Sequence, residues 1–275
     1  MGNAFQRWST ATPCCPPGSE PIKPAASDYE PRGKTITLSR QDGGKPITVY
    51  LSPPPKPSSA AVLVAHDIGG PFTGRHKEVC DQLAEQGYWV ALPDLFKAPM
   101  PLVFPPWFRF PYLFPTIYRN MTRPWKEMEQ DVSKVIEHLV ESEKVERIGL
   151  LGFCYGAFTV FKAGGEKFTK AHPEKQKNKK PMFVTSQSED KWEIVKSVCV
   201  PQMVLATNWE PADWRPGGKV ESILKQKEEL PDCRFEGFPN QKHGFFIRGD
   251  IQKEEVKKDV DRAFQLTLEF FHQYL

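Results

Sequence analysis

The chain has 275 residues, of which 39% are hydrophobic and 26% charged, and it carries a formal net charge of +3. This composition is ordinary for a globular protein, and the charge is too small to indicate a nucleic-acid-binding domain, which usually has a strongly basic face. No stretch reaches the roughly 18 uninterrupted apolar residues of a transmembrane helix. The longest candidate, residues 100–117, is interrupted by prolines and an arginine. We therefore expect neither a transmembrane segment nor a nucleic-acid partner.

The N-terminus lacks the charged-then-apolar pattern of a secretory signal, so we expect a cytoplasmic protein with reduced thiols. The six cysteines include no CxxC pair, which argues against structural zinc, and we expect neither metal nor cofactor. Association with a membrane through a lipid anchor stays open, because the chain begins Met-Gly-Asn. Myristoylation favours Ser or Thr at position 6, where Gln6 stands, and Cys14 and Cys15 are candidate second acylation sites.

Residues 1–30 are rich in Pro, Ser, Gly and Ala and are expected to form an extended arm ahead of one α/β domain over residues 31–275. Two short strands are predicted at 34–39 and 46–51, and the Gln-Asp-Gly-Gly sequence between them favours a hairpin turn. A continuous apolar run, typical of a strand buried on both faces, occurs at 60–65, and further buried strands are expected at 88–92, 147–153 and 202–207. A last strand is expected at 233–238. Helices are expected at 74–86, 124–142, 157–164, 220–229 and 253–274.

Strands that alternate with helices predict an α/β fold with a mostly parallel central sheet and helices on both faces. Ligands of such sheets lie at the carboxyl ends of the strands. Residues 97–124, which are rich in aromatic residues and prolines, would form a cap segment over these ends. The cap either lines an apolar pocket or packs without a role in specificity, and an exposed cap could contact a membrane or a partner. The polar residues 165–197 show no clear pattern.

The sequence Gly152-Phe153-Cys154-Tyr155-Gly156 lies between a predicted buried strand and the helix that follows it. The pattern Gly-x-Ser-x-Gly at such a place makes the sharp turn that presents a nucleophile, and here cysteine replaces serine. The turn is too tight for a side chain at either flank. The sulfur would lie at the N-terminus of the helix, which favours the thiolate. The alternative is a buried cysteine without a chemical role.

A base is expected after the last strand and before the final helix of this architecture, and His243 lies there. His66 also ends a predicted strand, but it directly precedes the expected oxyanion loop, where a base would be misplaced. His76, His138 and His272 fall on predicted helices and are expected to be structural. His243 is therefore the favoured base.

These residues resemble the dienelactone hydrolase family, the carboxymethylenebutenolidase-like α/β-hydrolases, over about residues 29–275. The most specific matches are Gly152–Gly156 (GFCYG) and His243–Asp250 (HGFFIRGD), with supporting matches at 65–69 (AHDIG) and 92–96 (LPDLF). The resemblance implies the α/β-hydrolase fold. It also implies that a small lactone, ester or thioester is hydrolysed through a Cys–His–acid triad and an acyl-enzyme.

Carried over by this resemblance, Cys154 is the nucleophile and His243 the general base. The backbone N–H groups of Ile68 and Tyr155 would form the oxyanion hole. Asp67 matches an acidic position beside the oxyanion loop, where it would contact the resting cysteine and control its protonation.

Arginines bind substrate carboxylates in the family, and this makes several arginines of the chain candidates for that role. Arg248 is the best placed, because it follows His243 closely in the sequence. The other candidates are Arg109, Arg119 and Arg123. A solvated or salt-bridged arginine is the alternative for each of them.

The triad acid is left open by the loop after the strand at 202–207. Direct alignment places Glu210 on the acid position, whereas Asp213 requires a shift of three residues, and both residue types serve in this fold. If neither reaches His243, hydrolysis would be weak, and the fold could be a scaffold that binds a ligand or a protein. A redox-sensing thiol protein is a third hypothesis, with less support because no resolving cysteine lies near in sequence.

Overall fold

The computed structural model describes residues 18–22, 29–40, 43–96, 115–116, 118–171, 180–182, 191–228, 230 and 232–275. In this part of the chain, eight strands form one sheet in the order β1-β2-β4-β3-β5-β6-β7-β8. They are β1 Lys34–Leu38, β2 Ile47–Ser52, β3 Ala60–Ala65, β4 Trp89–Pro93, β5 Arg147–Gly152, β6 Lys180–Met182, β7 Met203–Thr207 and β8 Arg234–Phe238. The β1–β2 and β2–β4 pairs are antiparallel and the others are parallel, so the predicted mostly parallel sheet is confirmed.

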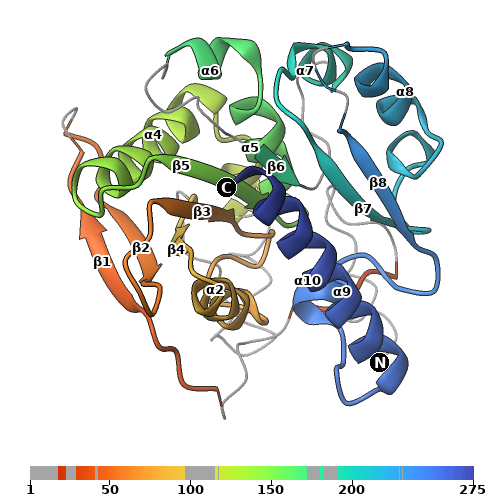
Figure 1. Cartoon of the computed structure of the whole chain (residues 1–275), viewed down its shortest axis with the longest axis horizontal. Coiled ribbons are helices and arrows are strands. Elements are labelled where there is room, and N and C mark those ends of the chain that lie inside the picture. The colour runs from red at the N-terminus through yellow and green to blue at the C-terminus, as the bar shows by residue number, and fades with distance from the viewer. Residues whose placement is uncertain are drawn as a thin grey trace.

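The helices lie on both faces of the sheet (Figure 1). On one face lie α2 (His76–Glu85), α9 (Phe245–Arg248) and α10 (Glu254–Tyr274). On the other face lie α4 (Trp125–Glu141), α5 (Gly156–Ala163), α6 (Glu166–Ala171), α7 (Lys191–Ser197) and α8 (Lys219–Lys225). The layers agree with the predicted arrangement, because a parallel sheet must cover both of its apolar faces.

Strand β3 shows why a continuous apolar run forms a central strand. All six of its residues are buried. Ala61, Leu63 and Ala65 pack in the core on one face, whereas Ala60, Val62 and Val64 pack in the core on the other. Successive side chains of a strand point to opposite faces, so a strand covered on both sides requires apolar residues at every position.

The structure differs from the predicted elements at three places. Residues 165–197, which showed no pattern, contain α6, the three-residue strand β6 and α7. The helix expected at 220–229 ends at Lys225, because the chain turns there and brings Leu230 into the core. The four-residue helix α9 was not predicted. The expected cap segment at 97–124 lies for the most part outside the described residues, which resume at 115.

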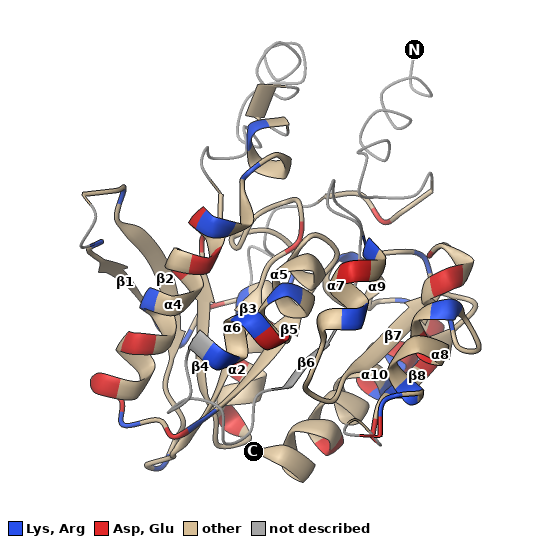
Figure 2. Ribbon diagram, turned by 90° about the horizontal axis from the view of Figure 1, so that it is seen from above, with Lys and Arg blue, Asp and Glu red and all other residues tan. Residues whose placement is uncertain are grey.

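Helix α4 shows how the outer surface is divided between apolar and charged side chains. Its buried side includes Met128, Val132, Val135 and Leu139, which recur at helical spacing. Acidic and basic residues are mixed along the rest of the helix (Figure 2). Of the helices that the structure describes, none has the length and apolar character required to cross a membrane.

The segment that leads into β1 is fixed to α2 by one buried carboxylate. Asp81 accepts hydrogen bonds from the Tyr29 and Tyr50 hydroxyls, the Ser52 hydroxyl and the Arg32 backbone N–H. Burial acts to raise the pKa of the Asp81 carboxyl, but these four hydrogen bonds outweigh it and hold the pKa below its ordinary value. The ionised form is therefore the one that stabilises the fold.

We predict that Asp81→Asn lowers the free energy of unfolding at pH 7 by about 2 kcal/mol, since it removes hydrogen bonds to a charged acceptor. A carboxyl whose pKa is depressed in the folded state contributes stability above its unfolded pKa of about 4, and this contribution is lost as the pH falls. Urea unfolding at pH 7 and pH 3.5 should therefore show a smaller acid effect in Asp81→Asn than in the wild type. Exposed Glu85, which pairs with Arg32, supplies the control Glu85→Gln. Equal acid effects in Asp81→Asn and the wild type would contradict the prediction.

Candidate functional site

The turn at Cys154 joins the end of β5 to the start of α5. Cys154 has a φ of 53°, which a side-chain-bearing residue rarely adopts. A Cβ on Gly156 would overlap the carbonyl oxygen of Ala65 at the end of β3, and one on Gly152 would lie 2.6 Å from the carbonyl oxygen of Gly156. Gly156 is thus required by the close approach of the turn to β3, and Gly152 is required because the turn folds back closely on itself. The turn places the thiol at the carboxyl end of the central strands.

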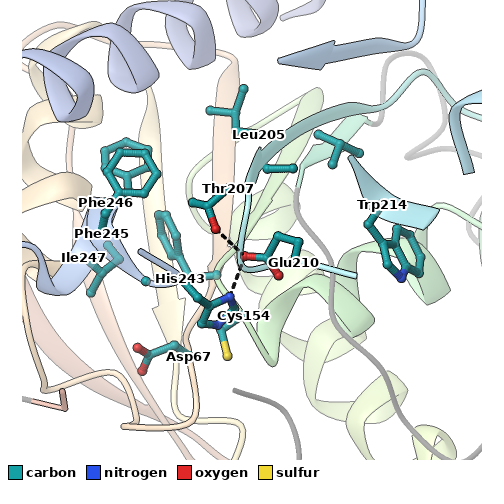
Figure 3. Close-up of a pocket in the computed structure, with 14 residues that line it drawn as sticks. Asp67, Cys154, Leu205, Thr207, Glu210, Trp214, His243, Phe245, Phe246 and Ile247 are labelled. Carbon is teal, nitrogen blue, oxygen red and sulfur yellow. Dashed lines mark hydrogen bonds and ion pairs between the residues drawn. The ribbon is translucent and has the colours of Figure 1, made fainter. Parts of the chain in front are cut away.

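His243 lies between β8 and α9 and is 3% exposed. Its Nδ1 is 2.6 Å from Oε1 of Glu210. Because a buried ionised carboxylate only accepts hydrogen bonds, Nδ1 is the protonated nitrogen of the neutral ring, and Nε2 is left as the basic one. His243, Glu210 and Cys154 line one pocket, and the imidazole lies between the carboxylate and the sulfur in Figure 3.

Glu210 is held in place by the loop that follows β7. Its backbone N–H donates to the carbonyl oxygen of Thr207, and its carbonyl oxygen accepts from Nε of Arg215 at 2.7 Å. Asp213, the other candidate acid, lies in a short 3-10 helix, where it pairs with Lys191 at 2.9 Å and is 38% exposed. The structure therefore brings Glu210, and not Asp213, to His243.

The oxyanion loop begins at the end of β3 with His66 and Asp67. The Gly69 N–H donates to Oδ1 of Asp67 at 2.7 Å, and the Gly70 N–H donates to the Asp67 carbonyl oxygen. Ile68 is fully buried against Cys154. Its backbone N–H donates to no acceptor within the described residues. Ile68 therefore packs against Cys154, and Tyr155 follows Cys154 directly in the chain.

Asp67 lies in the same pocket with its carboxylate 2% exposed. Oδ2 of Asp67 is 3.2 Å from Nε of Arg248, whose side chain is 1% exposed. Two opposite charges at this depth compensate each other, because an isolated charge would be costly to bury. Arg248 is thus engaged by Asp67 in this conformation, and a substrate carboxylate would have to share or replace that contact.

His66 and His76 support the predicted oxyanion loop through hydrogen bonds between their imidazole rings and its backbone. Nδ1 of His66 donates to the Asp67 carbonyl oxygen, and its Nε2 accepts from the Leu95 N–H at 3.0 Å. Nδ1 of His76 donates to the Thr73 carbonyl oxygen, and its Nε2 accepts from the Asp67 N–H at 3.2 Å. Burial lowers the pKa of both histidines, so both are neutral. With both ring nitrogens occupied by backbone groups, neither is available as a base.

Arg75 is a positioning residue that the sequence did not single out. Its guanidinium donates to the carbonyl oxygens of Phe245, Phe246 and Gly249, and thereby fixes α9 against α2. His243 precedes α9 and Arg248 is its last residue, so Arg75 holds the helix that lies between them in the chain. No local motif marks such an arginine, because its acceptors are backbone atoms about 170 residues away in the chain.

The other predicted arginines are not assembled at the pocket. Arg123 is buried, donates to the Leu95 carbonyl oxygen and pairs with Asp131 of α4, so its contacts are those of a structural ion pair. Arg109 lies outside the described residues. Arg119 is exposed on the short helical segment before α4. Of the candidates for binding a carboxylate, Arg248 alone is adjacent to a residue of the pocket among those described.

Comparison with known proteins gives a consistent result. A family model described as the dienelactone hydrolase family matches residues 47–275. The carboxymethylenebutenolidase homolog of Xenopus tropicalis is 23% identical and covers 90% of this chain and 93% of its own length. Hydrolase tropI of Talaromyces stipitatus is 27% identical, with coverages of 84% and 88%.

Solved structures support the same fold. A putative dienelactone hydrolase from Klebsiella pneumoniae has a TM-score of 0.64 at 19% identity and covers 88% of this chain and 98% of its own. Dienelactone hydrolase from Anabaena variabilis has a TM-score of 0.58 at 15% identity, with coverages of 90% and 100%. The predicted α/β-hydrolase fold is confirmed.

We predict that His243→Ala slows the alkylation of Cys154 by iodoacetamide at pH 7 by at least about tenfold, since a neighbouring base promotes the thiolate. Peptide mass mapping gives the rate at each cysteine separately. Cys80 is an internal control, because burial raises the pKa of its thiol well above the ordinary value. A Cys154 alkylation rate that is indifferent to His243 would contradict a working Cys–His pair.

Proposed function

Since the chain belongs to the dienelactone hydrolase family, and is thereby a hydrolase acting on ester bonds, we propose that it cleaves small lactones, esters or thioesters through Cys154, His243 and Glu210. The observation that carries this proposal is the 2.6 Å contact between His243 Nδ1 and Glu210 Oε1. The contact lies in the pocket that Cys154 enters from a strained turn.

In the proposed acylation step, the Cys154 thiol transfers its proton to Nε2 of His243, and the sulfur attacks the carbonyl carbon of the substrate. The carbonyl oxygen becomes an oxyanion, which accepts hydrogen bonds from the backbone N–H groups of Ile68 and Tyr155. The C–O bond to the leaving group then breaks, and the leaving oxygen takes the proton from His243. The product is a thioester on Cys154.

In the second step, water attacks the thioester while His243 accepts its proton. The Cys154 thiolate leaves, is reprotonated by His243, and the carboxylic acid is released. For a lactone, both new groups belong to one product molecule. Glu210 keeps the imidazole in the tautomer whose Nε2 is basic and stabilises the imidazolium that forms in both steps.

Asp67 and Arg248 set the electrostatic environment of the resting thiol. A carboxylate beside Cys154 would oppose formation of the thiolate, and Arg248 offsets that charge while it holds Asp67. We propose that a substrate carboxylate competes for Arg248. This would change the charge next to the thiol when the substrate binds.

A non-catalytic scaffold is the alternative function. Its support from the sequence was the irregular loop that should supply the triad acid. The contact of Glu210 with His243 argues against this alternative, because the Glu210 carboxylate lies within hydrogen-bonding distance of the proposed base. The two functions are separated by direct measurement of hydrolysis.

We expect the wild type to hydrolyse p-nitrophenyl acetate and a small lactone such as dihydrocoumarin, and Cys154→Ala to reduce kcat to the uncatalysed level. Cys154→Ser should retain little activity, because the hydroxyl is a weaker nucleophile than a thiolate in this site. Product formation is followed by absorbance, and circular dichroism verifies that the variants are folded. Full turnover by Cys154→Ala would show that the proposed nucleophile is wrong.

Glu210→Gln should lower kcat/KM by about a thousandfold or more, because the amide neither fixes the correct tautomer of His243 nor stabilises its imidazolium. Asp213→Asn is the matched control on the same loop and should change kcat/KM by less than about twofold, since its exposed pair with Lys191 is remote from the base. If Asp213→Asn lowers kcat/KM more than Glu210→Gln does, the triad acid is Asp213.

A further inference from the structure

Five residues of the predicted N-terminal arm, residues 18–22, lie against the candidate site. We name Gly18–Ile22 the N-terminal strap. It contacts the acid loop through Gly18, the base through Glu20, and the nucleophile and oxyanion residues through Ile22. A segment far from the site in sequence therefore touches every loop that contributes to the proposed catalysis.

Gly18 packs closely against the loop that holds Glu210. It has a φ of 90°, and a Cβ there would lie 2.7 Å from the ring of Trp209, the residue before Glu210. Glycine is required by both the backbone conformation and the contact. The neighbouring Ser19 is buried, with 4% of its surface exposed. The first residues of the strap are therefore packed closely against the rest of the protein at the site.

Glu20 joins the strap to the base by a backbone hydrogen bond. Its N–H donates to the carbonyl oxygen of His243 at 2.9 Å. This bond fixes the position of the strap along the site, because a shift of one residue would break it. It also means that the strap remains docked without any requirement for a particular side chain at position 20.

Ile22 packs beside the proposed nucleophile. Its side chain packs against the cluster formed by Ile68 and Cys154, together with Phe96 and Met121. A Cβ on Gly69 would lie 2.9 Å from Cγ2 of Ile22, so the oxyanion loop is in direct contact with this side chain. An acyl group attached to Cys154 with its oxygen at the Ile68 N–H would share this space.

The chain is anchored again shortly after the strap. Tyr29 and the Arg32 backbone bind the buried Asp81 of α2. The strap is therefore held at His243 on one side, and the following segment is held at α2. Two fixed attachment points restrict the positions that Ile22 can adopt.

We propose that the N-terminal strap forms a wall of the acyl site and that Ile22 limits the size of the acyl group that Cys154 accepts. This inference rests on the proposed hydrolysis and names a specificity-determining residue for it. An isoleucine side chain at this place excludes long or branched acyl chains by contact, while the site stays open to small ones.

The test compares kcat/KM for p-nitrophenyl acetate and p-nitrophenyl octanoate. In Ile22→Ala the octanoate-to-acetate ratio should rise at least fivefold, and in Ile22→Trp it should fall. Ile36→Ala is the control, because Ile36 is also a half-buried isoleucine but lies on the edge strand β1, away from the pocket. Ratios within twofold of the wild type in both Ile22 variants would overturn the proposal.

The backbone bond gives a second pair of variants. Glu20→Pro removes the N–H that binds His243, so the octanoate-to-acetate ratio should move in the same direction as in Ile22→Ala. Glu20→Ala keeps the N–H and should leave the ratio closer to that of the wild type. Equal ratios in these two variants would show that the bond does not hold the wall in place.

Access to Cys154 is also measured without hydrolysis, by its alkylation with N-ethylmaleimide and the bulkier N-cyclohexylmaleimide. Ile22→Ala should raise the rate with the bulky reagent relative to the small one, at Cys154 but not at Cys199. If no ester is hydrolysed by the wild type yet this selectivity shifts, the proposed function fails and the wall stands. If esters are hydrolysed but Ile22→Ala changes neither the octanoate-to-acetate ratio nor the ratio of alkylation rates, the proposed role of Ile22 is wrong and the proposed function is retained.

Discussion

The close approach of Gly156 to the carbonyl oxygen of Ala65 places the turn that carries Cys154 directly against the end of β3. Only a residue without a side chain fits there, and in the same turn Cys154 adopts a backbone conformation with positive φ. The same contact brings the oxyanion loop, which begins at the end of β3, next to the thiol. The positions of Ile68, Asp67 and Cys154 thus depend on one steric constraint between two neighbouring strands.

Around this turn, charged and polar groups of the pocket contact specific partners. Glu210 binds His243, Arg248 pairs with Asp67, and two neutral histidines bind backbone groups beneath the oxyanion loop. Buried charges and polar groups are costly unless they are paired, so these contacts also restrict how each group can move. Such fixed groups favour reactions in which a proton is transferred over a short distance between neighbouring side chains.

The strap and Arg75 show that residues far from the site in sequence hold its elements in position. Arg75 of the loop before α2 holds α9 through three backbone carbonyl groups, and Glu20 holds the strap on the backbone of His243. Both interactions use main-chain acceptors or donors, which every residue carries. Residues 18–22, which belong to the predicted N-terminal arm, are therefore part of the proposed site.

Much of the architecture was predictable from local patterns. The runs at 60–65, 147–153 and 202–207 are apolar because central parallel strands are buried on both faces, and they were located to within a residue. The sequence also predicted a tight turn at Gly152–Gly156 and placed His243 after the last strand, and the structure has both features at one pocket. Strand β6 was missed, because three residues are too few to show a periodicity.

The tertiary structure decided what depends on contacts between distant residues. The sequence left Glu210 and Asp213 both open, and the path of the loop after β7 brings Glu210 to His243 while Asp213 pairs with Lys191. The tertiary structure also pairs Arg248 with Asp67 and Arg123 with Asp131, and it packs Ile22 against the cluster of Ile68 and Cys154. A sequence pattern reports burial and local backbone geometry, whereas the partner of a buried charge is set by which loops the completed sheet brings together.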